Sequence, residues 1–318
     1  MEGKGGDADG RPRVLVAGGC GQIGRNFVKF LVDNDLCSYI AVADKTMPVI
    51  AYFGAAHKEA FASPVVKYVQ ADLSKERFIA KVFDGQEYDF IFNLAAETKY
   101  GQAEDLYEKN IVAVSTNLGE AAQRQSGLRM FVEVSTAHVY KSQSKKPAKE
   151  DYKTDPWTKQ GEFSLRAEDA LRAMDQSALP LTIVRPALVY GTADTTAIMP
   201  RAVVAASYKQ LGKKMKFLWD TKTRINTVHM ADVCRALWHV ATDGAAAKPA
   251  GEAAVYNLAD KGDTNQGSVN AILKELFGIK TGFYGKLLSS LAKLNLEQVV
   301  EQANDDHLQP WMELTAVR

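Results

Sequence analysis

Three glycines stand at the spacing that a phosphate-binding turn requires. Gly18, Gly21 and Gly24 form a GxxGxxG pattern directly after a short apolar run. Glycines at these positions allow a tight turn, a close approach of the backbone to a pyrophosphate, and packing of the next helix on the strand. Amides at the start of that helix, including those of Gln22 and Ile23, then bind the phosphate charge. The pattern predicts a dinucleotide site.

An acidic residue follows at the distance that this chemistry requires. Asp44 ends the second apolar run, twenty positions after Gly24. A carboxylate there accepts hydrogen bonds from both ribose hydroxyls and repels a 2′-phosphate, so we predict NAD as the cofactor. NADP stays the alternative, because Arg25 and Lys45 are near enough to pair with an extra phosphate.

The elements that must position these residues alternate along the chain. Continuous apolar runs are separated by amphipathic stretches, as in βαβ units whose strands are buried on both faces. We predict strands at 14–17, 39–43, 65–69, 90–95, 130–134 and 181–184, and helices at 22–34, 74–84, 103–125 and 161–175. A further helix is expected within 46–62. The fold class is α/β, with a doubly wound parallel Rossmann sheet.

The pattern loosens after Gly191, which indicates a second domain. We expect helices at 199–210 and 230–242, and strands at 214–218, 226–229 and 254–258. Apolar residues within 284–303 are spaced as one helical face, typical of a core or docking face. The domains we predict are a flexible tail at 1–12, a dinucleotide-binding Rossmann domain at 13–195, and a smaller α/β substrate-type domain at 196–318. The strand at 254–258 is expected to return to the main sheet.

Composition argues against several classes of function. The 318 residues include 39 basic and 38 acidic side chains, for a net charge of +1, which gives no electrostatic reason to expect nucleic acid or a membrane surface as a partner. No run reaches the roughly 18 apolar residues of a membrane span. Three scattered cysteines indicate no disulfide framework and fit a reducing compartment, so we predict a cytoplasmic protein. The five histidines show no ligand spacing, so no metal is expected.

These motifs also occur in a familiar order. Over residues 13–260 the chain resembles the extended short-chain dehydrogenase/reductase family of nucleotide-sugar epimerases and dehydratases and 3β-hydroxysteroid dehydrogenases. The resemblance rests on AGGCGQIG at 17–24, Asp44, ADL at 71–73, NLAAETKYG at 93–101, Asn110, VSTAHVY at 134–140, VRPALVYG at 184–191, TVHMADVCRAL at 227–237 and YNLAD at 256–260.

The resemblance implies further site residues and a mode of association. By this analogy Asp72 and Leu73 lie beside the adenine, Ala95 and Ala96 line the cofactor cleft, and Asn110 joins the cofactor-binding residues. Family members often dimerise through helices equivalent to 103–125 and 161–175, so a homodimer is expected on analogy alone.

The chain departs from the family at its catalytic residues. Thr136 fits the family's Ser/Thr position, but the Tyr-x-x-x-Lys pair that should follow is missing. Aligning the family's glutamate with Glu168 puts Gln160 at the tyrosine and Ser164 at the lysine, and none of the twelve tyrosines has a lysine four positions later. Without that lysine no nearby cation lowers a phenol pKa from about 10, so the usual proton transfer is absent.

Replacements for the missing pair are few. The acidic pair of the dehydratases corresponds to Ala137 and His138, and His138 is the best substitute because imidazole titrates near neutral pH. Lys99, with Tyr100, is a second candidate in the loop after the fourth strand. The remaining residues near the missing pair receive structural roles: Lys159 and Arg166 as solvated surface, and Trp157 and Phe163 as residues that fill the vacated volume.

Three functions therefore compete. The leading one is an NAD(H)-binding protein with degenerate catalytic residues, a pseudoenzyme used as a structural, regulatory or assembly subunit with protein partners. The second is an active NAD-dependent oxidoreductase or epimerase, acting on a sugar nucleotide or a hydroxysteroid-like substrate through His138 or Lys99. The third is a redox sensor whose partner affinity differs between NAD⁺ and NADH.

Overall fold

The computed structural model describes residues 10–141, 147–243, 252–287 and 289. They divide into two units. The first takes the described parts of Met1–Thr98, Glu104–Pro186 and Ala231–Asn257, and the second takes those of Lys99–Ala103, Ala187–Met230 and Leu258–Arg318. This division differs from the predicted boundary after residue 195, because the chain leaves the first unit at Pro186 and returns to it at Ala231.

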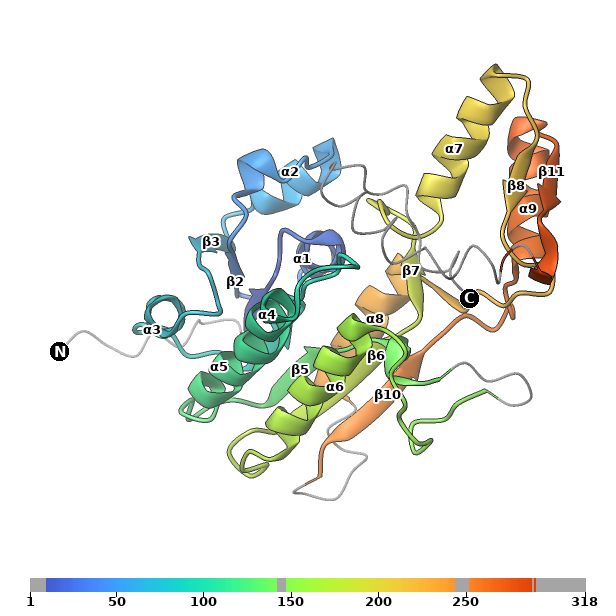
Figure 1. Cartoon of the computed structure of the whole chain (residues 1–318). Coiled ribbons are helices and arrows are strands. Elements are labelled where there is room, and N and C mark those ends of the chain that lie inside the picture. The colour runs from blue at the N-terminus through green and yellow to red at the C-terminus, as the bar shows by residue number, and fades with distance from the viewer. Residues whose placement is uncertain (1–9, 142–146, 244–251, 288, 290–318) are drawn as a thin grey trace. The chain divides into compact units, whose positions relative to one another are not determined.

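A seven-stranded sheet forms the centre of the first unit (Figure 1). Its strands, in spatial order, are β10 (Ala254–Leu258), β6 (Leu181–Pro186), β5 (Met130–Val134), β4 (Phe90–Asn93), β1 (Arg13–Ala17), β2 (Tyr39–Asp44) and β3 (Val66–Gln70). All neighbours from β6 to β3 pair in parallel. The strand order reverses at β1, and ligands of such sheets bind at the carboxyl ends of strands beside the reversal.

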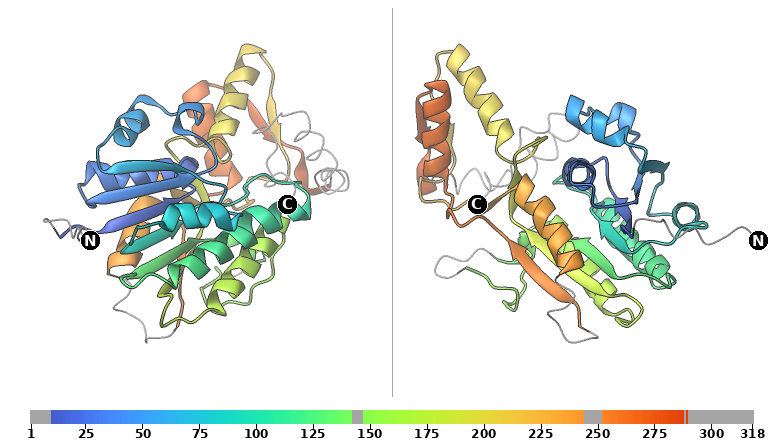
Figure 2. Two further views of the ribbon diagram at one scale, coloured as in Figure 1. Left: turned by 90° about the vertical axis from the view of Figure 1, so that its left-hand side faces the viewer. Right: turned by 180° about the vertical axis from the view of Figure 1, so that it is seen from behind.

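Helices cover both faces of this sheet (Figures 1 and 2). One face carries α3 (Glu76–Phe83), α5 (Ala113–Ala122) and α6 (Lys159–Arg172), and the other carries α1 (Gln22–Asp33) and α8 (Met230–Thr242). Alternation along β4 explains the arrangement, since successive side chains of a strand point to opposite faces. Ile91 packs with residues of α3, α5 and α6, whereas Phe90 contacts Trp238 of α8 and Phe92 contacts Phe27 of α1.

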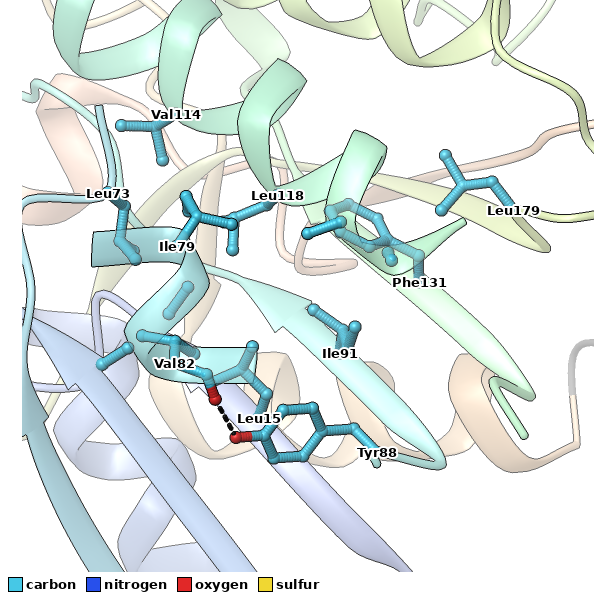
Figure 3. Packing of buried hydrophobic residues seen from close by; sticks show 14 of the residues in the cluster. Leu15, Leu73, Ile79, Val82, Tyr88, Ile91, Val114, Leu118, Phe131 and Leu179 are labelled. Atoms are coloured by element: carbon cyan, nitrogen blue, oxygen red, sulfur yellow. Dashed lines mark hydrogen bonds between the residues drawn. The ribbon is translucent and has the colours of Figure 1, made fainter. Parts of the chain in front are cut away.

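The core under α3 and α5 is apolar and closely packed (Figure 3). Leu15, Ile91 and Phe131 come from three neighbouring strands and are fully buried. The one hydroxyl drawn in this cluster is satisfied, because Tyr88 Oη donates to the Val82 carbonyl at 2.7 Å. This hydrogen bond offsets the free-energy cost of burying the phenol. The apolar core, which includes Leu15, holds β1, the strand that leads into the glycine turn.

Shorter elements connect the main ones. The 46–62 segment forms the 3-10 turn η1 (Pro48–Ile50) and the helix α2 (Ala55–Phe61). The predicted 103–125 helix consists of α4 (Glu104–Tyr107), the π-helical turn η2 (Glu108–Val112) and α5. A 3-10 turn, η3 (Ala137–Val139), follows β5.

The described part of the second unit includes two small parallel sheets and the helices α7 and α9. Strand β7 (Leu188–Tyr190) pairs with β9 (Thr227–His229), and β8 (Met215–Phe217) pairs with β11 (Thr281–Phe283). Helices α7 (Met199–Gln210) and α9 (Gln266–Phe277) share a core with β8. The buried Asp194 carboxylate accepts backbone N–H groups from residues 196–199 at 2.7–3.0 Å, in the segment that leads into α7. Of the amides in the first turn of α7, which a helix start leaves without intrahelical partners, Asp194 reaches that of Met199.

The predicted fold class is confirmed: the chain has the α/β Rossmann-like sheet and small additional C-terminal sheets. The sequence interpretation missed β7, α9 and β11. Residues 1–9 of the predicted tail, and 288 and 290–303 of the predicted apolar helical face, lie outside the described residues. In the part of the chain that is described, no helix combines the length and apolarity needed to cross a bilayer.

Candidate functional site

The glycine-rich turn after β1 has a backbone that other residues cannot adopt. Gly18 has a φ of +73°, in the left-handed region, and a Cβ there would lie 2.6 Å from the backbone of Ala95. A Cβ on Gly24 would lie 2.3 Å from the Gly18 carbonyl oxygen. The turn is closed by Gly18 N–H donating to Ala43 O at 2.8 Å and Gly21 N–H donating to Gly18 O at 3.0 Å. Glycine is therefore a steric requirement at both Gly18 and Gly24.

The start of α1 is prepared for an anion. Gly21 is the N-cap residue, no side chain caps the helix, and its first turn, which holds Gln22, Ile23 and Gly24, contains no acidic residue. The contrast with α7 is direct, because Asp194 already supplies a carboxylate to that helix. An uncapped helix start directly after a glycine turn attracts phosphate through its amides and the helix dipole.

Asp44 lies beside this turn, at the end of β2. Its Oδ2 accepts the Cys20 N–H at 2.9 Å, and its Oδ1 accepts the Thr46 N–H at 2.8 Å. The Tyr68 hydroxyl donates to the carbonyls of Asp44 and Thr46 at 3.0 and 3.1 Å, which fixes the strand end. A carboxylate accepts about four hydrogen bonds, so Asp44 keeps acceptor capacity beyond these two.

Arg25 and Lys45, the two cations that kept NADP as an alternative, have different surroundings. The Arg25 guanidinium donates to the carbonyls of Cys20 and Gly21 at 2.5–3.1 Å and stacks 4.8 Å from the centre of the Phe53 ring. Lys45 is exposed. Because most of its guanidinium faces the turn's own carbonyls, Arg25 supports the turn, and the arrangement favours NAD over NADP.

The residues assigned by resemblance lie at neighbouring strand ends. Asp72 and Leu73 follow β3, and Asp72 accepts from Ser74 Oγ at 2.7 Å and from Lys75 Nζ at 3.3 Å. Partial burial alone would raise the pKa of Asp72, but these hydrogen bonds and the charge of Lys109 keep this pKa below its usual value. Leu73 is buried, and its carbonyl accepts from Asn117 Nδ2 at 3.1 Å.

The loop after β4 lies against the glycine turn. Leu94 N–H donates to Ala17 O at 2.9 Å, and Ala95 is the residue that Gly18 approaches. Ala96 is exposed, and Asn110 in η2 donates to Glu97 Oε2 at 3.3 Å. The structure thus brings the loop that carries Ala95 to the turn.

Thr136 and His138 share the turn η3. Thr136 Oγ1 accepts the His138 N–H at 3.2 Å, which caps the turn. The His138 ring meets the Trp157 ring edge-on, with 5.0 Å between ring centres. Gly161 of α6 packs so closely that a Cβ there would lie 2.6 Å from the His138 carbonyl oxygen. The start of α6 therefore touches the turn that carries both residues.

Helix α6 carries the residues that the sequence analysis aligned with the Tyr-x-x-x-Lys pair. Gln160 lies in its first turn, and Ser164 and Glu168 follow at intervals of four, so all three share one helix face. Ser164 and Glu168 are buried. Neither an amide nor a hydroxyl supplies the acid or the cation of a Tyr-Lys pair.

The neighbours of these positions on and before α6 have mostly structural contacts. Lys159 forms exposed ion pairs with Glu104 at 2.6 Å and Glu162 at 3.3 Å, and Arg166 pairs with Glu108 at 2.7 Å. Phe163 is buried and stacks on Tyr107, with 5.7 Å between ring centres. Lys99 is exposed, and both Lys99 and Tyr100 belong to the second unit.

Two buried polar clusters were missed by the sequence analysis. One joins Glu133, Asn93 and Ser115. The other joins Glu168, Arg185 and the Tyr140 hydroxyl, which donates to Asn257 Oδ1 at 3.1 Å. A signal for the first was present in the sequence, because Glu133 is a charged residue inside the apolar run MFVEV.

The sheet, its strand order and the glycine turn with Asp44 define a Rossmann-type dinucleotide-binding protein. Among the described residues, no group of three or more His, Cys, Asp or Glu side chains is arranged to hold a metal ion. Residues 14–259 match the model of the NAD dependent epimerase/dehydratase family. The chain belongs to this family, and the prediction of NAD as the cofactor is confirmed at the level of the family.

Curated relatives include enzymes of sugar-nucleotide metabolism. A dTDP-glucose 4,6-dehydratase from Mycolicibacterium smegmatis is 27% identical over 242 residues, which is 73% of this chain and 69% of the relative. The low-salt glycan biosynthesis protein Agl12 from Haloferax volcanii is 30% identical over 133 residues, 40% of each chain. The alignment with the Haloferax protein thus spans about two fifths of its length.

Solved structures confirm the fold. WbmG from Bordetella bronchiseptica in complex with NAD has a TM-score of 0.71 and 18% identity, covering 88% of this chain and 83% of that one. A UDP-glucuronic acid 4-epimerase from Bacillus cereus in complex with NAD has a TM-score of 0.68 and 19% identity, covering 86% and 90%. At these identities the likeness extends to the fold, and it places no catalytic residue.

Proposed function

We propose that this chain binds NAD(H) at the turn of residues 18–24 and that its catalytic residues are degenerate, so that it serves as a structural, regulatory or assembly subunit. The proposal is supported by an intact, sterically required glycine turn together with the sequence interpretation that aligns Gln160 and Ser164 of α6 with the family's tyrosine and lysine. Removal of an acid/base group costs about 10²–10⁴-fold in rate.

The remaining site residues agree with this proposal. Asp44 holds the Cys20 amide and keeps acceptor capacity for a ribose, while Asp72, Leu73, Ala95, Ala96 and Asn110 are the other residues proposed around the dinucleotide. The three cysteines are free and buried, which supports the reducing, cytoplasmic location predicted from the sequence.

A turnover assay tests the proposal. The purified chain, saturated with NAD⁺, is incubated with UDP-glucose, UDP-glucuronic acid, dTDP-glucose and a 3β-hydroxysteroid, and products are followed by mass spectrometry and NADH by absorbance. We expect binding of the cofactor without multiple turnovers on any of these substrates. Sustained NAD-dependent turnover of any of them contradicts the degenerate active site.

A second candidate function is catalysis with His138 as the substitute acid/base. It is supported by the place of His138 in η3, two residues after Thr136 and in contact with the start of α6. If turnover is found, His138→Asn should lower kcat by about 10²-fold or more while leaving cofactor affinity unchanged. Lys99→Met tests the alternative acid/base residue. A loss of kcat in this variant but not in His138→Asn would assign the acid/base role to Lys99.

A further inference from the structure

A buried carboxyl group, that of Glu133, lies in β5, which is two strands away from the strand that leads into the cofactor turn. Glu133 of β5 stands opposite Asn93 of β4 in the parallel register. Asn93 Nδ2 donates to Glu133 Oε2 at 2.8 Å, and Ser115 Oγ of α5 donates to Glu133 Oε1 at 2.8 Å. Asn93 Nδ2 also reaches Ser115 Oγ at 3.0 Å. In the described structure, the two groups that donate hydrogen bonds to Glu133, Asn93 and Ser115, are therefore neutral.

This cluster is connected to the glycine turn through one side chain. The other end of the Asn93 amide, Oδ1, accepts the Ala95 N–H at 3.2 Å. The Ala95 backbone is the surface on which Gly18 rests, since a Cβ on Gly18 would lie 2.6 Å from it. The sequence of contacts therefore runs from the Glu133 carboxyl through Asn93 to Ala95 and Gly18.

The charge on Glu133 decides which way the Asn93 amide faces. An ionised carboxylate only accepts hydrogen bonds, so it requires Nδ2 toward itself and leaves Oδ1 for the Ala95 N–H. A protonated carboxyl can donate to Oδ1, which lets the amide reverse and turns Nδ2 toward another donor, the Ala95 N–H. The ionised form alone therefore enforces the contact that holds Ala95.

We propose that Glu133 is a positioning residue for the dinucleotide, whose carboxylate orients Asn93 so that Ala95 is held against the Gly18 turn. This inference rests on the proposed function, because it concerns NAD binding at that turn. It makes affinity for the cofactor depend on the protonation of a buried carboxyl group that acts through Asn93 and Ala95.

Glu133 is expected to change between its protonated and its ionised form near neutral pH. Burial raises the pKa of Glu133 to about 7, even though the hydrogen bonds from Ser115 and Asn93 lower it. From α6 the charge of Glu168 raises it further, and Glu168 is itself paired with Arg185 and Arg172. On the β6 side Glu133 stands opposite Ile183, which is apolar. Affinity for NAD should therefore rise as the pH increases through this range.

Calorimetric titration of NAD⁺ into the full chain at pH 6.0 and pH 8.5 tests the proposal. One net hydrogen bond of about 1 kcal/mol corresponds to about a fivefold change in Kd, so we expect the chain to bind about fivefold more tightly at pH 8.5. Glu133→Gln should make the two values equal, because an amide does not titrate in this range. Glu120→Gln, on the exposed side of α5, should retain the fivefold ratio.

A second variant separates positioning from a general loss of packing. Ser115→Ala removes one donor that stabilises the ionised carboxylate, so the midpoint of the affinity profile should move to higher pH while tight binding persists at alkaline pH. A pH-independent Kd in the unmodified chain, or a fivefold ratio that survives Glu133→Gln, overturns the inference and leaves the proposed function intact. Absence of NAD binding at every pH overturns both.

Discussion

Two glutamates buried in the same unit have opposite surroundings. Glu168 accepts two hydrogen bonds from Arg185, at 2.9 and 2.5 Å, and a third from Arg172 at 3.1 Å. Glu133 is surrounded by an amide and a hydroxyl. Burial alone would lower the pKa of Arg185, but the hydrogen bonds to Glu168 keep this pKa above its usual value. In contrast, burial raises the pKa of Glu133 to about 7.

The comparison shows that burial does not by itself decide the charge of a carboxyl group. The buried Arg185 guanidinium forms an ion pair with Glu168 through two hydrogen bonds. Neutral donors leave Glu133 able to gain a proton near neutral pH. The first arrangement ties α6 to β6, and the second can respond to its environment.

The largest effect is expected from breaking the ion pair. Arg185→Met leaves the Glu168 carboxylate buried with one cation fewer, which should lower the free energy of unfolding by about 3–5 kcal/mol. Urea unfolding followed by circular dichroism measures this. Arg172→Met, at the half-exposed partner, is the matched control and should cost about 1 kcal/mol or less. Equal losses in the two variants would contradict the special role of the buried pair.

A pH-dependent change in stability is expected from Glu133. Its folded pKa of about 7 lies above the unfolded value, so the folded state binds the proton more tightly. This contribution is fully present below about pH 4.3 and is lost as the pH rises through about 7, a decrease of roughly 4 kcal/mol. Unfolding of the chain and of Glu133→Gln across pH 5–8 measures it. A variant with the same slope as the unmodified chain would count against this origin.

A smaller effect is expected where the ion pair meets η3. Tyr140→Phe removes the hydroxyl that accepts from Arg185 and donates to Asn257. Leaving these buried groups with one partner fewer should cost about 1–2 kcal/mol. Chemical unfolding compares it with Tyr52→Phe, at a side chain that is 96% exposed, which should show no change. If both variants are neutral, the hydroxyl carries no net stabilisation.

The smallest effect is a pH dependence of stability that is opposite in sign to the one expected from Glu133. His57 of α2 is buried against α1, with its Nε2 3.2 Å from Asn26 Oδ1. Burial, and then the charges of Arg25 and Lys29, lower the pKa of His57. Stability is therefore full above the unfolded value of about 6.5 and falls as the pH drops below it. Hydrogen exchange of α2 amides at pH 5 and pH 7.5 should show faster opening at pH 5, and His57→Gln should remove that difference.

Local signals in the sequence predicted much of the fold and the cofactor half of the site. The limits predicted for β5, α7, α8 and β10 agree with the structure, because apolar runs and helical periodicity are local properties. The predicted turn at Gly18 has the left-handed backbone that only glycine adopts easily. Strands β7 and β11 were missed although β8 and β9, which are also three residues long, were predicted, so the short length alone does not explain the difference.

The buried polar clusters could not be predicted in the same way. Asn93 and Glu133 are forty positions apart and meet only because β4 and β5 pair in a specific register. Arg185 finds Glu168 from a different strand and helix. The sequence showed that charged residues stand in apolar runs, but the sheet register and helix packing decide which partner each one receives.

The central claim, that NAD rests on the Gly18 turn, is tested most directly by calorimetric titration of NAD⁺ into the unmodified chain and into Gly18→Ala. A Cβ at Gly18 would clash with Ala95, so we predict one binding site in the unmodified chain and its loss in the variant. Gly85→Ala, at another glycine with positive φ but with open space around it, should bind normally. Unchanged affinity in Gly18→Ala, or no affinity for NAD in the unmodified chain, would contradict the account.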